Sequence, residues 1–133
     1  MIVPDTTAWV GFLRGAGHPL HLTMRELVDE GEDLTTTGII LMELLAGASS
    51  DEHAKSIRDM LLEYPVLQLL GTTGYEEGAR IYRACRAGGE TVRKMTDCLI
   101  AAVVIRAGAA LLHANRDFDV IARHTGLRIH PTA

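Results

Sequence analysis

The sequence predicts a single α/β domain, in which a central parallel β-sheet of four to five short strands carries helices on both faces. Three observations predict it. The chain has 133 residues, which suits one domain. Short apolar runs alternate with longer segments that have the hydrophobic spacing of helices. No internal repeat, heptad run or linker indicates another architecture.

The strands are expected where short apolar runs are bounded by turn residues. The first is Ile2–Val3, and its pairing should end about at Pro4, because proline donates no hydrogen bond to a neighbouring strand. The later candidates are 34–37, 66–70, 110–112 and, as the fifth, 127–129.

Helices are expected between these strands. Thr6 or Thr7 is the expected cap of the first helix, and Thr96 that of the helix that precedes the fourth strand. Gly71 to Gly74 is expected to be a turn. The expected helices are 6–12, 19–28, 38–46, 51–64, 75–87 and 97–108, and residues 113–119 are expected to form a polar loop.

Composition narrows the functional classes. The chain is 47% hydrophobic and 23% charged, which argues against disorder. With 17 acids against 13 basic residues, the net charge of −4 gives no overall basic field for nucleic acid. Cys85 and Cys98 fit a reduced compartment. The N-terminus lacks the features of a signal peptide, and the longest apolar run is far too short for a membrane span, so we expect a soluble cytoplasmic protein.

Acidic side chains recur where the sheet predicts a ligand site, because ligands bind outside the carboxyl ends of parallel strands. Asp5 follows the first strand, and Asp117 and Asp119 follow the fourth. Glu43 interrupts an apolar helix after the second strand, where an unpaired carboxylate costs stability. Asp97 opens the most apolar helix, at an N-terminus that also favours an acid without any function.

Taken singly, Asp5 is also explained as a turn residue and the late aspartates as solvated loop acids. Gathered in one crevice, such acids repel each other and must protonate or bind a cation. Oxygen ligands select Mg²⁺ or Mn²⁺, and the His18 and His21 pair lacks the further ligands that zinc requires. The acids therefore predict a divalent-cation site.

The four acidic motifs, in their order along the chain, resemble those of PIN-domain ribonucleases, and most of all the VapC toxins of toxin–antitoxin pairs. They are Asp5-Thr6-Thr7, Glu43 in ILMELLAG, Asp97 in TDCLIAA, and HANRDFDVIA. The resemblance implies an Mg²⁺- or Mn²⁺-dependent endoribonuclease that cuts structured RNA, commonly tRNA or rRNA. It also implies a cognate antitoxin that inserts a C-terminal segment at the active site, and a homodimer.

The resemblance assigns the acidic cluster to Asp5, Glu43, Asp97 and Asp117. We expect Asp5, Asp97 and Asp117 to be metal ligands, and Glu43 to orient the attacking water or complete the shell. Thr6 and Asn115 are supporting residues. Asn115 departs from the family, which commonly has an aspartate there, and should lower the metal affinity because an amide adds no negative charge.

RNA needs a basic surface beside this acidic site. Arg80, Arg83 and Arg86 recur every three residues along one helix, a pattern that also suits a solvated face. Arg86 and Arg93 flank the loop that leads to Asp97 and are the predicted RNA contacts. Trp9 and Phe12 are expected in the core or at a partner contact.

Other functions are weighed against the nuclease. A PIN-like module without turnover, which pairs with an antitoxin and acts by RNA binding or by autoregulation of its operon, is favoured by Asn115. A haloacid-dehalogenase-type phosphatase requires a second acid where Thr7 stands, and a receiver domain requires an acidic pair and a late lysine that the sequence lacks.

Overall fold

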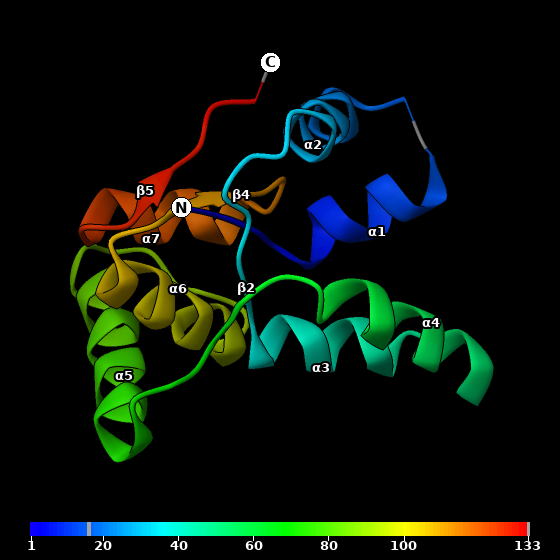
Figure 1. Ribbon diagram of the computed structural model, residues 1–133. Helices are drawn as coiled ribbons and strands as arrows, with labels where there is room; N and C mark the ends of the chain where they lie inside the picture. The colour runs from blue at the N-terminus through cyan, green and yellow to red at the C-terminus, as the bar shows by residue number, and fades with distance from the viewer. Residues whose placement is uncertain (16, 133) are drawn as a thin grey trace.

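Parallel strands form the centre of the molecule in the computed structural model, which describes residues 1–15 and 17–132 (Figure 1). The first sheet has the order β1-β4-β5, and the second pairs β2 with β3. A bridge between Ile2 and Leu34 joins the two, with the Ile2 N–H donating to the Asp33 carbonyl at 2.9 Å. The strands are β1 (Ile2–Pro4), β2 (Thr36–Thr37), β3 (Val66–Leu67), β4 (Ala110–Leu112) and β5 (Arg128–Ile129).

Helices connect these strands and cover both faces of the sheet. They are α1 (Thr6–Arg14), α2 (Pro19–Asp29), α3 (Gly38–Ala46), α4 (Asp51–Leu61), α5 (Gly71–Ala87), α6 (Met95–Ala107) and α7 (Arg116–His124). Helix α1 packs on α2 and α3, and α5 packs on α6 and α7. Figure 1 shows α1 to α4 on the right and α5 to α7 on the left. The parallel strands with helices on both faces confirm the predicted fold class.

The core fills the space between sheet and helices. Trp9 and Phe118 are its largest fully buried side chains, so the expected burial of Trp9 is confirmed. Helix α6 is buried along most of its length, which explains why it is apolar nearly throughout. Cys85 and Cys98 are free and buried. None of the described helices combines the length and apolarity needed to cross a bilayer.

The structure corrects several local expectations. Residues 116–119 are not loop but the first turn of α7, with Asn115 as the cap. Helix α5 already begins at Gly71. The cap of α1 is Asp5 rather than either threonine, and Lys94, not Thr96, precedes α6 without a side-chain cap. Helix α4 and strand β3 are shorter than expected, whereas pairing of β1 ends at Pro4 as predicted.

Candidate active site

Asp5 lies where β1 passes into α1. Its backbone is extended and its side chain caps the helix: Oδ1 accepts hydrogen bonds from the Ala8 N–H at 3.0 Å and the Thr7 hydroxyl at 2.6 Å. Such a cap satisfies a donor that the helix itself leaves unpaired. The residue is only 2% exposed. The structure therefore fixes one carboxylate at the carboxyl end of a central strand.

Glu43 comes from α3, and its partner is Thr6 of α1. The Thr6 hydroxyl donates to Glu43 Oε1 at 2.7 Å across 37 residues of sequence. Glu43 is half-buried, while Ile40 and Leu44 of the same helix are buried in the core. Burying a carboxylate without a hydrogen-bond partner costs stability. The Thr6 hydroxyl, which comes from another helix, provides that partner for Glu43.

Asp97 lies in the first turn of α6 and contacts Asn115, the cap of α7. The Asn115 side-chain amide donates to Asp97 Oδ2 at 3.1 Å, while Asn115 Oδ1 accepts from the Asp117 N–H at 3.0 Å. Both ends of the amide are therefore engaged within the protein. Asn115 acts as a hydrogen-bond donor to an acidic neighbour rather than as a free oxygen ligand.

Asp117 is buried beside this group, and its carboxylate faces Arg93. It accepts from the Arg93 backbone N–H at 3.2 Å and lies 3.3 Å from Arg93 Nε. Because two donors from one residue bind it, Asp117 holds the loop before α6 against α7. Its assignment as a metal ligand stays a prediction.

The acids from separate elements line one small cavity of about 100 Å³. The lining consists of Asp5, Thr6, Thr7, Glu43, Lys94, Asp97, Ile100, Asn115 and Phe118. The structure thus brings Asp5, Glu43 and Asp97 together, whereas Asp117 is not part of this lining. Sequence reasoning missed Thr7 and Lys94 as site residues. Lys94 stands three positions before Asp97, and that spacing was the available signal.

The buried acids of this cavity have perturbed pKa values. Burial raises the pKa of Asp5 to about 6, against the hydrogen bonds from Thr7 and Ala8. Burial likewise raises the pKa of Asp97 to about 6; Asn115 opposes this shift and the charge of Glu43 adds to it. Removal from water disfavours the charged form, and neighbouring acids disfavour it further. The cavity therefore concentrates negative charge that a cation would relieve.

The donor set suits a hard divalent ion held largely through water. Among residues 1–15 and 17–132, no group of three His, Cys, Asp or Glu side chains is placed to enclose an ion directly. Mg²⁺ commonly uses only one or two carboxylates and keeps several waters. Asp5 and Asp97, with Glu43 beside them, meet that requirement. Carboxylates that repel one another in a small polar cavity are thus compatible with Mg²⁺ or Mn²⁺.

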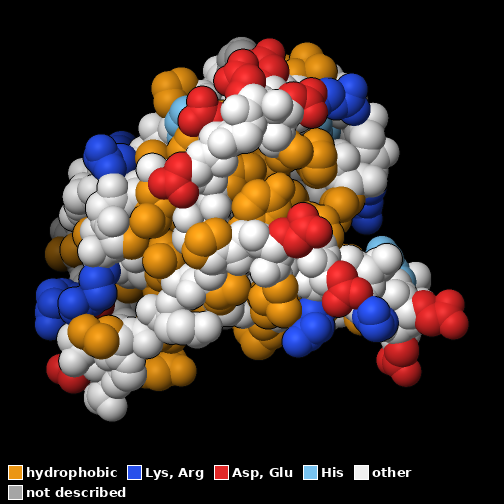
Figure 2. Space-filling view, viewed as in Figure 1, with side chains coloured by type: hydrophobic (Ala, Val, Ile, Leu, Met, Phe, Trp, Pro, Cys, Tyr) orange, Lys and Arg blue, Asp and Glu red, His pale blue; other side chains and the backbone are white. Residues whose placement is uncertain are grey.

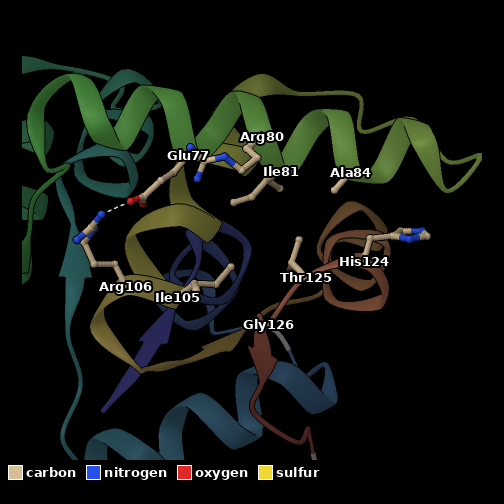
Figure 3. A pocket seen from close by; sticks show the side chains of 9 residues that line it. All are labelled: Glu77, Arg80, Ile81, Ala84, Ile105, Arg106, His124, Thr125 and Gly126. Atoms are coloured by element: carbon tan, nitrogen blue, oxygen red, sulfur yellow. Dashed lines mark hydrogen bonds and ion pairs between the residues drawn. The ribbon is translucent and has the colours of Figure 1, made fainter.

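The predicted basic residues lie apart from the acidic cavity lining. A larger cavity, of about 590 Å³, lies between α5, α6 and the end of α7, and Arg80 lines it. Figure 3 shows its lining side chains. Its lining carboxylate, Glu77, is paired with Arg106, so this cavity holds no comparable cluster of acids. The guanidinium carbon Cζ of Arg86 lies 5.8 Å from the centroid of the Tyr82 ring. Arg93 is two-thirds exposed beyond its contact with Asp117.

Comparisons with known proteins agree with this geometry. Residues 2–124 match the PIN domain. The chain is 40% identical over 129 residues to Ribonuclease VapC11 of Mycobacterium tuberculosis, a match that covers 96% of each chain. It is equally similar to VapC ribonuclease Mb1587 of Mycobacterium bovis.

A solved structure gives the same fold. VapBC2 of Rickettsia felis, bound to a DNA fragment from its promoter, superposes with a TM-score of 0.74 at 20% identity and covers 98% of both chains. At that identity the likeness establishes the fold alone. The chain belongs to the PIN-domain family and, within it, to the VapC ribonucleases.

Proposed function

We propose that the protein is an Mg²⁺- or Mn²⁺-dependent endoribonuclease that acts as the toxin of a toxin–antitoxin pair. The observation that carries the proposal is the cavity in which Asp5, Glu43 and Asp97 meet from three distant segments. The relatives named VapC ribonuclease support RNA as the substrate class. Structured RNA, either tRNA or rRNA, is the proposed target.

The chemistry follows from the positions of the side chains. A divalent cation at this site would lower the pKa of a bound water and polarise a phosphoryl oxygen. Asp5 and Asp97 would hold the cation. Glu43, which accepts a hydrogen bond from the Thr6 hydroxyl, would orient the attacking water. Lys94 adds a positive charge to the cavity lining, where it favours an approaching phosphate.

The RNA backbone requires further cations outside the cavity. Arg93 belongs to the loop immediately before α6, and its exposed guanidinium is anchored to the neighbouring Asp117. We assign Arg93 and Arg86 to phosphate contacts, because both are exposed, Arg93 within this loop and Arg86 at the end of α5, which precedes it. Their positive charges would offset the acidity of the site for a polyanionic substrate.

The proposed inhibitor is a cognate antitoxin protein that lies along α1. One cavity runs between α1 and α2 and shares Thr6 and Thr7 with the acidic cavity. A second, between α1, α3 and α4, shares Glu43 with it. A peptide segment in either groove would therefore reach the catalytic carboxylates. The likeness to the VapBC2 structure supports an antitoxin as the kind of partner, and its position along α1 is part of the proposal.

A homodimer is also proposed, through an apolar surface formed by α3, the segment after β3, α5 and the start of α6. We call it the apolar patch, and define it by the exposed side chains Met42, Leu70, Tyr75 and Met95. Figure 2 shows hydrophobic side chains at the surface between α5 on the left and α3 on the right. A groove lined by Ile39, Leu67 and Leu99 runs beside Met42 and Tyr75. Contiguous apolar surface of this kind is typical of an interface.

Cleavage of purified tRNA and rRNA tests the enzymatic proposal. We expect Mg²⁺- or Mn²⁺-dependent products that EDTA abolishes. Asp5→Asn and Asp97→Asn should each lower the rate at least 100-fold, because each removes a charge that holds the cation. Asp29→Asn, an exposed acid at the end of α2, is the matched control and should cleave like the wild type. Equal activity in EDTA would contradict the metal requirement.

A second function, an RNA-binding module without turnover, is favoured by Asn115. Its amide is engaged on both sides and adds no negative charge to the site. A mobility-shift assay on the same RNAs separates the two functions. Stoichiometric binding with no cleavage under either cation would establish the module and exclude the nuclease.

A further inference from the structure

We propose that His113 is a positioning residue, which holds the turn after β4 so that Asp5 and Asp97 keep their geometry; the inference rests on the proposed function. His113 directly follows β4 and is 8% exposed. Its ring packs against that of Phe118, with centroids 5.3 Å apart, and Phe118 lines the acidic cavity. The imidazole is therefore built into the wall behind the site.

The decisive contact is made by the Nδ1 atom of His113. It accepts the backbone N–H of Asn115 at 2.9 Å, two residues along the chain. This contact closes a tight side-chain turn of the kind that aspartate and asparagine form. Because Nδ1 accepts, it carries no proton, and in the neutral ring the proton resides on Nε2. Burial lowers the pKa of His113, which favours this neutral form.

The turn held by His113 reaches both acids. Asn115 donates its side-chain amide to Asp97 at 3.1 Å. The Ala114 N–H donates to the Thr7 hydroxyl at 3.2 Å, and that hydroxyl donates to Asp5 at 2.6 Å. One short segment, residues 113–115, thus connects Asp97 on α6 with Asp5, the cap of α1. If the turn opens, both hydrogen bonds lose their geometry.

The other ring nitrogen plays no equivalent part. The buried Nε2 of His113 has no hydrogen-bond partner among the described residues, although it lies 3.4 Å from the exposed carboxylate of Asp119. That carboxylate faces solvent, away from the acidic cavity lining. The structure therefore assigns the positioning role to Nδ1 and not to the contact with Asp119.

Two substitutions separate the two nitrogens. In His113→Asn the amide oxygen takes the place of Nδ1 and can still accept the Asn115 N–H. In His113→Gln the longer amide reaches the place of Nε2, and the acceptor beside Asn115 is lost. Both variants lose the ring contact with Phe118, so both bear a similar packing cost. Asp119→Asn is a third variant that leaves the core unchanged and removes only the charge near Nε2.

We expect His113→Gln to lower kcat for RNA cleavage by about 10- to 100-fold with little change in KM, as for residues that orient metal ligands. His113→Asn should stay within about threefold of wild type, and so should Asp119→Asn. Calorimetric titration of each metal-free protein with Mn²⁺ should show the same ranking of affinities. Equal losses in His113→Asn and His113→Gln, at equal melting temperatures, would overturn the proposal.

Hydrogen exchange of the Asn115 backbone amide tests the turn without RNA or metal. We expect protection in the wild type and in His113→Asn, and faster exchange in His113→Gln. Equal protection in the two variants would refute the role of Nδ1. A clear difference in protection, together with a wild-type protein that cleaves no RNA, would support the turn and overturn the proposed nuclease function alone.

Discussion

Asp97 shows how a single residue connects stability with function. Its pKa is raised to about 6 from 3.8, chiefly by burial, so the folded protein binds this proton more tightly than the unfolded chain does. The stability that this proton contributes is fully present below pH 3.8 and is lost as the pH rises through 6. At neutral pH the metal-free site thus holds a charged group that opposes folding. A carboxylate kept at such a cost is best explained by its chemistry.

Asp97→Asn should therefore stabilise the metal-free protein at pH 7.5. A shift of about two pKa units corresponds to a stabilisation of at most about 3 kcal/mol. The hydrogen bond from Asn115 becomes weaker when the carboxylate is replaced by a neutral amide, and this offsets part of the gain. The advantage should vanish near pH 4, where Asp97 is protonated. Calorimetric melting in EDTA at both pH values measures this difference. A melting temperature lowered at pH 7.5 would mean that Asp97 is a structural residue.

Sequence reasoning identified the acids because a carboxylate within an apolar segment is visible without a structure. Glu43 and Asp97 interrupt or open such segments, and both line the acidic cavity. Lys94 and His113 were not predicted as site residues, because a lysine in a loop and a histidine after a strand are common without any function. For Lys94 the spacing before Asp97 was the one signal that the sequence offered. Their roles depend on which distant side chains the fold brings within a few ångströms.

Helix α7 is the element that the sequence left undetected. Its first residues, Arg116 and Asp117, are polar, which favoured a loop. The cap Asn115, the acids of the first turn and the basic residues of the last turn nevertheless follow the usual pattern of a helix. Phe118 and Ile121, one turn apart, bury its apolar side. Short helices of this kind depend on tertiary packing more than on propensity.

The packing of α1 on α2 gives a prediction at the scale of elements. A Cβ added at Gly11 would lie 1.4 Å from His21 Nε2, so the imidazole of α2 occupies the space that a side chain would take. Gly11→Ala should displace that ring and destabilise the protein by about 1–3 kcal/mol, as overpacking does. Denaturant unfolding measures the change.

Gly47→Ala serves as the matched control for this substitution. Its added Cβ would meet nothing closer than 3.7 Å, and the backbone φ of −85° suits alanine. The change should be neutral or stabilising by up to about 1 kcal/mol, because alanine restricts the unfolded chain. Equal stabilities of the two variants would show that α2 shifts freely on α1.

At the scale of the whole molecule, alternating strands and helices sufficed to predict a parallel sheet with acids at its carboxyl edge. The division into two sheets, which a bridge between Ile2 and Leu34 joins, was beyond prediction, because β2 and β3 are two residues long. Pairing of such short strands is decided by the helices packed on them. The net charge of −4 describes the whole chain, and it does not show that Arg86 and Arg93 provide positive charge locally.

The apolar patch provides the last prediction. Tyr75 is 59% exposed beside the groove that contains Leu67 and Leu99, so a partner copy would bury it on association. Light scattering after size exclusion should give twice the 14.4 kDa of one chain for the wild type. Tyr75→Asp should yield the monomer, because a buried unpaired charge opposes association. Leu22→Asp alters a comparably exposed residue on α2, outside the patch, and should leave the dimer intact. A monomeric wild type, or dissociation by Leu22→Asp alone, would refute this interface.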